Sequence, residues 1–523
     1  MLKRSAPGAI FCLLVLACMT SAAVGAAGPE GTLIMARQIE AQYLDPNVAT
    51  SDRSLNLAVF GSLVGRSLLN GSYSPDLAKS WEVLDPTTWK FNLRKGIKFQ
   101  DGTEVTSVDV KFSFDRTMGK FDPKFRGFRK GELNREVASI EAPDAYTVII
   151  KSQEADASFL GVPMLVNVVP KAYIEKLGDK EYAKSPLGFG PYKVKEIAVG
   201  EGVKLEAFED YWNAKPKPGE IGRSKVKAVI LKTLPQEATM VAALKAGEID
   251  GFFGANTDTA KDLEKLPDLT IFRAPASLHG FFLLNCRAEK DPATGKPNPL
   301  RDVRVRLAVN YAIDWTSIIK NYLTGHEYRT TLVRRDQIGY DPKAPLYPYD
   351  PEKARKLLAE AGYGEGVSLP FHYPESARQP YMDAIWEYWR TVGINVKPTP
   401  LSSAAHLQGV YSKEFFGIIA WAGGYGPDPG NWFRVMVPYD GLQAMHPPNA
   451  QVEELEKKQG VEFDFKKRVE LIRQLSAILM KEAWFVPAIH GVEQAVLNTK
   501  KWTVDKKQLP LSALPLTGIA KRK

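Results

Sequence analysis

The sequence has little cysteine, no strong excess of charge of either sign, and no long apolar run beyond its N-terminal segment. Three cysteines in 523 residues exclude a small scaffold held together by disulfides. The 69 basic and 60 acidic side chains give a net charge of +9 without a run of five basic residues, which excludes a dedicated nucleic-acid binder. With 44% hydrophobic and 25% charged residues, the chain is globular and long enough for more than one core.

The sequence also lacks the motifs of common enzymes. It contains no phosphate-binding loop, no Gly-x-Gly-x-x-Gly dinucleotide fingerprint and no Gly-x-Ser-x-Gly nucleophile elbow. Its six histidines are scattered, whereas a helical zinc site needs two histidines four residues apart. We therefore expect no catalytic residue, no metal site and no cofactor.

The N-terminal segment has the pattern of a secretory signal peptide. Lys3 and Arg4 precede an apolar stretch over 9–19, which is followed by small residues. This stretch is much shorter than the roughly 20 residues of a membrane-spanning helix. We expect residues 1–26 to be removed and the mature protein to be periplasmic. A lipoprotein attachment site at Cys18 is the less favoured alternative.

From Gly31 onward, short apolar strands alternate with amphipathic helices, which is typical of an α/β fold. The predicted helices cover 55–69, 107–118, 235–246, 302–323, 350–361, 381–392 and 465–479. The predicted strands cover 32–36, 88–93, 97–99, 147–150, 281–286, 394–396 and 485–489. Residues 88–93 and 97–99 are expected to pair as a hairpin across Gly96. Cys286 lies in a predicted strand, where a buried and unreactive thiol is expected.

Several short motifs follow one another along the chain. The strongest is WKFNLRKGIKFQDG at 89–102. Further segments are LAKSWE at 77–82, DV at 109–110, GFGPY at 188–192, AGEID at 246–250, DVRVRLA at 302–308, DP at 350–351, GY at 362–363 and DP at 428–429. Together these motifs resemble the bacterial extracellular solute-binding proteins that serve peptide, nickel and opine ABC importers, known as family 5.

The resemblance implies a two-lobed periplasmic-binding-protein (type II) clamshell with an extra subdomain in lobe one. Lobe one is expected to comprise 27–65, 188–278 and 487–523, the subdomain 66–187, and lobe two 279–486. The implied function is that of the substrate-binding component of an ABC importer, a monomer that captures a peptide-like or other small polar solute and delivers it to the permease subunits. An exported hydrolase or a sensory ligand-binding module on the same scaffold is the alternative.

Three segments combine aromatic residues with polar or glycine residues, as ligand-facing loops do. They are 38–46, 278–281 and 421–432. The candidate ligand-binding residues are Tyr43, His279, Phe281, Trp421, Gly424, Tyr425, Asp428, Trp432 and Arg434. A role as core anchors beside a turn is the alternative for Trp421 and Trp432.

One position departs from the family pattern. Peptide-binding members place an aspartate a few residues before the Asp-Pro pair, where it holds the ammonium group of the ligand. Counting from Trp421 puts Gly424 at that position, and counting back from Asp428 puts Tyr425 there. A buried ammonium without a counter-ion is costly, so the ligand class stays open between a peptide and a blocked, cyclic, anionic or non-peptide molecule. Asp428 is expected to cap the loop backbone, and Arg434 to pair with an anionic group or with solvent.

Overall fold

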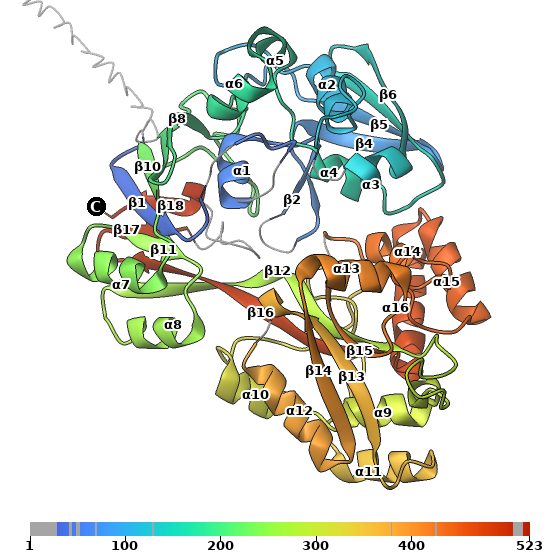
Figure 1. Ribbon diagram of the computed structural model, residues 1–523. Coiled ribbons are helices and arrows are strands. Elements are labelled where there is room, and N and C mark those ends of the chain that lie inside the picture. Colours follow the sequence, from blue (N-terminus) through green and yellow to red (C-terminus); the bar gives the residue numbers. More distant parts are fainter. Residues whose placement is uncertain are drawn as a thin grey trace, which may run out of the picture.

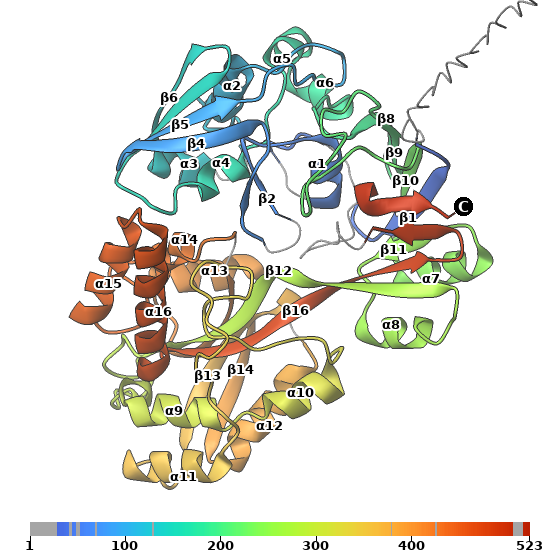
Figure 2. The same ribbon diagram turned by 180° about the vertical axis from the view of Figure 1, so that it is seen from behind.

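The computed structural model describes residues 29–40, 44–48, 53–67, 71–127, 130–377, 379–423, 426–505 and 516–522. The expected signal segment, 1–26, lies outside these residues. Two lobes face each other, and two long strands run between them (Figures 1 and 2). Within the described ranges, no helix combines the length and the apolar character needed to cross a membrane.

One ten-stranded sheet runs through both lobes. Its order is β14 (Ile394–Leu401), β13 (Val367–Pro374), β15 (Gly417–Gly423), β12 (Leu269–Asn285), β16 (Phe485–Asn498), β11 (Gly251–Phe253), β1 (Thr32–Arg37), β10 (Ala228–Thr233), β9 (Gly202–Ala207) and β8 (Tyr192–Ala198). The long strands β12 and β16 are antiparallel partners, with register shifts between Pro275 and Phe281. The irregular pairing lies where these strands pass from one lobe to the other (Figure 1).

Lobe one is built on the β1 side of this sheet. Its other elements are α1 (Arg53–Val59), α7 (Glu237–Ala246), α8 (Thr257–Leu263), β17 (Trp502–Val504), η4 (Leu516–Gly518) and β18 (Ile519–Lys521). Helix α7 ends because Gly247 adopts a left-handed φ of 77°, which glycine tolerates without strain. Buried side chains from β1, β9, β10 and β16 form the core, and α1 packs on it.

The subdomain has a four-stranded antiparallel sheet of its own. Its order is β4 (Ala78–Asp85), β5 (Thr88–Leu93), β7 (Thr147–Ser152) and β6 (Val137–Asp144). Its other elements are β2 (Val64–Arg66), β3 (Tyr73–Pro75), α2 (Ser107–Thr117), α3 (Lys130–Glu136), α4 (Gly161–Leu165), α5 (Lys171–Leu177) and α6 (Asp179–Lys184). Thr106 and Asp109 form a capping box that begins α2. Since the subdomain has a separate buried cluster around Phe91, it carries its own core.

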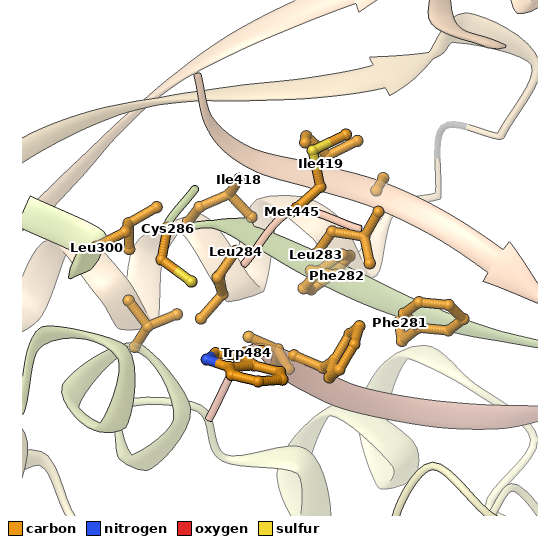
Figure 3. Close-up of a cluster of buried hydrophobic side chains, with 14 of the residues drawn as sticks. Phe281, Phe282, Leu283, Leu284, Cys286, Leu300, Ile418, Ile419, Met445 and Trp484 are labelled. Carbon is orange, nitrogen blue, oxygen red and sulfur yellow. The ribbon is translucent and has the colours of Figure 1, made fainter. Parts of the chain in front are cut away.

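Lobe two surrounds the other half of the large sheet. Its helices are η1 (Pro299–Arg301), α9 (Val303–Tyr311), α10 (Trp315–Tyr322), α11 (Pro351–Glu360), η2 (Glu375–Ala377), α12 (Tyr381–Thr391), α13 (Ser403–Ser412), α14 (Gly430–Met436), α15 (Ala450–Gly460) and α16 (Phe465–Glu482). In its core, the Phe282 ring lies 5.2 Å from Phe371 and 6.0 Å from Trp389. Cys286 lies in the same core, beside Leu284 and Leu300 (Figure 3), and burial raises the pKa of its thiol to about 11. The expectation of a buried thiol is confirmed.

Most of the predicted elements are present, but three predictions are wrong. The helix expected at 302–323 is two helices, because the Asp314 side chain accepts a hydrogen bond from the Ser317 amide and begins a second one. The helix expected at 55–69 ends at Val59, because the chain soon turns into β2, which pairs with β3. The hairpin of 88–93 with 97–99 does not form, because β5 pairs instead with β4 and β7.

Candidate ligand-binding site

A cavity of about 640 Å³ lies between the subdomain and lobe two. Helices α3 and α4 line it from the subdomain, and β12, β15, α12, α13 and α14 line it from lobe two. The cavity therefore lies in the cleft between two separately folded parts, which is a common place for a ligand site.

The lobe-two wall of the cavity is largely aromatic. Its six aromatic residues are Phe281, Phe282, Tyr381, Tyr411, Trp421 and Trp432. The half-buried Trp421 ring stacks on His406, with centroids 5.9 Å apart and planes 23° apart. Burial lowers the pKa of His406, so its imidazole is neutral at pH 7. Trp421 and His406 thus form a flat, uncharged surface suited to an apolar group of a ligand.

The charges of the cavity lie on the subdomain side. Glu132, Arg135 and Glu136 all come from α3 and line the cavity. Burial raises the pKa of Glu136 from 4.5 to about 7, against the opposing effect of Arg434. The cavity thus has an apolar wall on one side and an edge with charges of both signs on the other.

Three of the residues predicted from the sequence border the cavity. They are Phe281, Trp421 and Trp432. Phe281 has no exposed surface and Trp432 only 5%, and their rings lie 6.1 Å apart. Both therefore support the wall from beneath, as expected of core anchors. Trp421, which is half-buried, is the one of the three with substantial surface to offer a ligand.

Asp428 and Arg434 are not among the residues that line the cavity. Asp428 is buried, accepts a hydrogen bond from the Gly430 amide at 2.8 Å, and pairs with Arg468. Its role at the loop backbone is the one expected from the sequence. Arg434 forms ion pairs with Glu136 and Asp156 of the subdomain, at 2.9 and 2.8 Å. Its cationic group is thus directed to the protein's own carboxylates.

Three further candidates, Tyr43, Gly424 and Tyr425, lie outside the described residues, and for His279 only the backbone is described. The His279 backbone pairs with Gly423 of β15 and with His490 of β16, in the region where the long strands change register. All four stay predictions.

The sequence analysis missed the α3 and α13 contributions to the cavity. Glu132, Arg135 and Glu136 have the i, i+3, i+4 spacing that places side chains on one face of a helix, which is a signal the sequence did contain. Such spacing is common on solvated helices, however. His406 had no local signal, because it meets Trp421 only through the packing of α13 beside β15.

Among the described residues, no group of three or more histidine, cysteine, aspartate or glutamate side chains is placed to hold a metal ion. His446 stacks on Trp484 with centroids 3.9 Å apart. Its ring nitrogens lie 2.9 and 3.1 Å from the carbonyl oxygens of Pro447 and Met436. These contacts give His446 a structural role in the core of lobe two.

Two lobes connected by a pair of crossing strands, with a cavity in the cleft between them, define a clamshell solute-binding protein. Residues 72–441 match the sequence model of the bacterial extracellular solute-binding proteins, family 5 (middle part). The chain belongs to this family.

The relatives of this chain are named for different ligands. Glutathione-binding protein GsiB of Shigella flexneri is 31% identical over 349 residues, covering 65% of this chain and 64% of that relative. The chain thus matches just under two thirds of the length of the GsiB proteins. Heme-binding protein A of Haemophilus influenzae is 26% identical over 482 residues, covering 86% of this chain and 85% of that relative. The solved structure of HbpA2 from Haemophilus parasuis has the same fold, with a TM-score of 0.81 and 22% identity. The match covers 94% of this chain and 100% of HbpA2.

Proposed function

We propose that this protein is the substrate-binding component of an ABC importer, which captures a solute between its lobes and delivers it to the permease. The observation that carries this proposal is the cavity in the cleft, because its walls come from parts of the molecule that can separate. Closure around a solute and opening at the permease would then alternate at this cleft. Family membership supports the same role.

The lining of the cavity favours binding over hydrolysis. The described lining residues include no serine, threonine, cysteine or lysine, four of the side chains that form covalent intermediates. The imidazole of His406 is stacked on Trp421 rather than paired with a hydroxyl or thiol. A binding role without catalysis is therefore the better fit to this site.

The two sides of the cavity suit an amphipathic solute. An apolar or aromatic group would lie on Trp421, and a polar or charged group would reach Glu132 and Arg135. A short peptide or peptide-like molecule of this kind fits a volume of about 640 Å³. The neighbouring family members that bind glutathione and heme are consistent with an amphipathic ligand.

The division into lobes follows from the same proposal. The expected boundaries at 278/279 and 486/487 fall within β12 and β16, close to the register shifts between Pro275 and Phe281. Irregular pairing weakens the ladder locally, which suits a hinge. Residues 1–26 would direct export to the periplasm, where a monomer of this kind meets the permease subunits.

Native mass spectrometry of protein purified from its own host tests the proposal. We expect one small molecule per chain, released intact on unfolding and taken up again in the same ratio by the refolded protein. Calorimetry with the recovered molecule, with glutathione and with tripeptides that contain tryptophan or only glycine would then rank ligand classes. Conversion of the recovered molecule into a product during incubation would refute a pure binding role.

A further inference from the structure

Arg434 joins lobe two to the subdomain. It lies on α14, and its guanidinium forms ion pairs with Asp156 at 2.8 Å and with Glu136 at 2.9 Å. The Asp156 side chain is 8% exposed and the Glu136 side chain 16%. We call Arg434, Glu136 and Asp156 the interlobe cluster. The contact between the two parts thus withdraws the two carboxylates largely from water, while Arg434 stays 39% exposed.

The interlobe cluster adjoins the cavity. Glu136 lines the cavity as well as pairing with Arg434, and Asn431, one helical turn before Arg434, also lines it. The Asn431 side-chain oxygen lies 2.8 Å from the Ser158 hydroxyl of the subdomain. The same face of α14 therefore contributes both to the cavity wall and to the contact across the cleft.

The segment around Asp156 is held against lobe two along its length. The Ala157 amide donates a hydrogen bond to the Gly460 carbonyl at 2.8 Å. In the same part of the cleft, the Trp89 and Phe463 rings lie 6.0 Å apart. These contacts join neutral groups, whereas the interlobe cluster joins charged groups. The contribution of the cluster to closure therefore depends most on the balance between its positive and negative charges.

Arg434 is the cation that forms ion pairs with both carboxylates of the cluster. Arg434 faces three carboxyl groups, Glu136 and Asp156 of the subdomain and Glu456 of α15. Burial raises the pKa of Glu136 and of Glu456, so their surroundings in this structure disfavour a negative charge. Without Arg434 these groups would repel one another across the cleft, and the repulsion would be relieved by opening.

We propose that Arg434 is a closure residue: through Asp156 and Glu136 it stabilises the closed cleft relative to the open one, without itself contacting the ligand. This inference goes beyond the proposed function, because it concerns the opening equilibrium of the empty protein. Arg66 and Asp336 form a second ion pair between β2 and lobe two. Loss of the interlobe cluster therefore weakens closure rather than abolishing it.

The test measures closure without a ligand. Ser158→Cys and Asn431→Cys place one thiol on each side of the cleft, at side chains that are 2.8 Å apart in the structure. Dibromobimane reacts with two neighbouring thiols and fluoresces once it bridges them, so the bridging rate reports how often the cleft closes. Cys286 stays in place, because it is fully buried and its thiol pKa is raised to about 11. All variants are made in residues 27–523, which leave out Cys12 and Cys18, and this chain with Cys286 as its one cysteine is the blank.

In this double-cysteine parent, we expect Arg434→Met to slow bridging about tenfold, as expected for a charged contact across an interface. Arg390→Met is the matched control, since Arg390 pairs with Glu387 within α12 of the same lobe and should leave the rate unchanged. Asp156→Asn should also slow bridging. The double variant with Arg434→Met should slow bridging by less than the product of the two single effects, because both substitutions remove the same ion pair.

Two results would overturn the proposal. One is a bridging rate in Arg434→Met within about twofold of the parent, whether or not the melting temperature changes. The other is a parent that never bridges although each thiol reacts singly, since this face of the cleft would then not come together in solution. If Arg434→Met fails to fold, Asp156→Asn and Arg434→Lys give the same comparison.

Discussion

Two arginines of lobe two, Arg468 and Arg434, have opposite surroundings although both pair with aspartate. Arg468 is 6% exposed and pairs with Asp428, which is 1% exposed and belongs to the same lobe. Its guanidinium also donates to the Gln459 carbonyl at 2.9 Å. The Arg434 side chain is 39% exposed, and both of its carboxylate partners belong to the subdomain. The ion-pair partner of Arg468 thus lies in its own lobe, with one longer contact of 3.4 Å to the Ala157 carbonyl of the subdomain, whereas both ion-pair partners of Arg434 lie in the subdomain.

This difference separates stability from closure. Burial opposes the charge of Arg468, but its contacts with Asp428 outweigh that cost and raise the pKa of the guanidinium. The ion pair with Asp428 persists whether the cleft is open or closed, since Arg468 and Asp428 both lie in lobe two. The contacts of Arg434 exist only when the cleft is closed, and in the open form water solvates its partners. Arg468 should therefore control unfolding, and Arg434 should control opening.

The largest effect is expected for Arg468→Met. The substitution leaves the Asp428 carboxylate buried without its partner, which typically costs about 3–5 kcal/mol. We expect the urea midpoint and the melting temperature of the protein to fall markedly. Arg390→Met, which removes an exposed pair within α12, should change the free energy of unfolding by less than about 1 kcal/mol. Equal midpoints for the two variants would contradict the comparison.

The next largest effect is expected at the aromatic wall, which is separate from both arginines. Trp421→Ala should lower the affinity for the molecule recovered from the native protein at least tenfold, or about 1.4 kcal/mol. The reason is the loss of the flat surface formed with His406. The bridging rate of the double-cysteine parent should stay unchanged, so that binding and closure are altered by different residues.

Tyr322→Ala serves as the control for the calorimetry, because Tyr322 is exposed on α10 and does not line the cavity. An affinity of Trp421→Ala equal to that of the control would remove Trp421 from the candidate site. It would also shift attention to the α3 edge of the cavity.

A smaller effect on stability is expected for Arg434→Met. In the open form, water solvates Arg434, Glu136 and Asp156. Opening has therefore already broken their ion pairs, and unfolding of the open form breaks no further ion pair of this cluster. The free energy of unfolding should change by less than about 1 kcal/mol, as for a partly exposed ion pair. Urea titration beside Arg468→Met checks this. A loss as large as that of Arg468→Met would place Arg434 among the residues that hold lobe two together.

The sequence predicted the elements that depend on local pattern. The apolar stripe at 465–479 gave α16, and the Asp350-Pro351 pair marked the start of α11, because capping and periodicity act within a few residues. The sequence analysis missed the break at Asp314, which divides 302–323 into two helices. An aspartate within an amphipathic pattern is also typical of the solvent-exposed face of one continuous helix. The motif at 89–102 indicated the family, which the match of residues 72–441 to the family model confirms.

The candidate site was less predictable for a physical reason. Arg434 lies 278 residues from Asp156 and 298 from Glu136, and no local pattern connects them. Its expected partner was an anionic group or solvent, whereas the structure gives it carboxylates of the subdomain. Contacts across a cleft depend on how separately folded parts meet. They follow from topology and closure rather than from the periodicity of either segment.

The smallest effect, a pH dependence of closure, separates the interlobe cluster most directly from the contacts within lobe two. In the closed structure the pKa of Glu136 is about 7, against 4.5 for a solvated glutamate. The closed form therefore binds a proton more tightly than the open form between these values, so closure is favoured as the pH falls and loses this contribution as the pH rises through 7. The charged groups near Glu136 are Arg434, Glu132, Asp156 and Arg135.

We expect the bridging rate, divided by that of Glu136→Gln in the same double-cysteine parent, to rise from about pH 8 to about pH 5.5. The division removes the pH dependence of thiol ionisation, because glutamine does not titrate and the cysteines are the same. Such a rise would show that desolvation of Glu136, rather than its attraction to Arg434, dominates its titration. A ratio that falls with acidification would mean that the ion pair with Arg434 is the stronger influence, and a flat ratio would mean that Glu136 has the same environment in the open and closed forms.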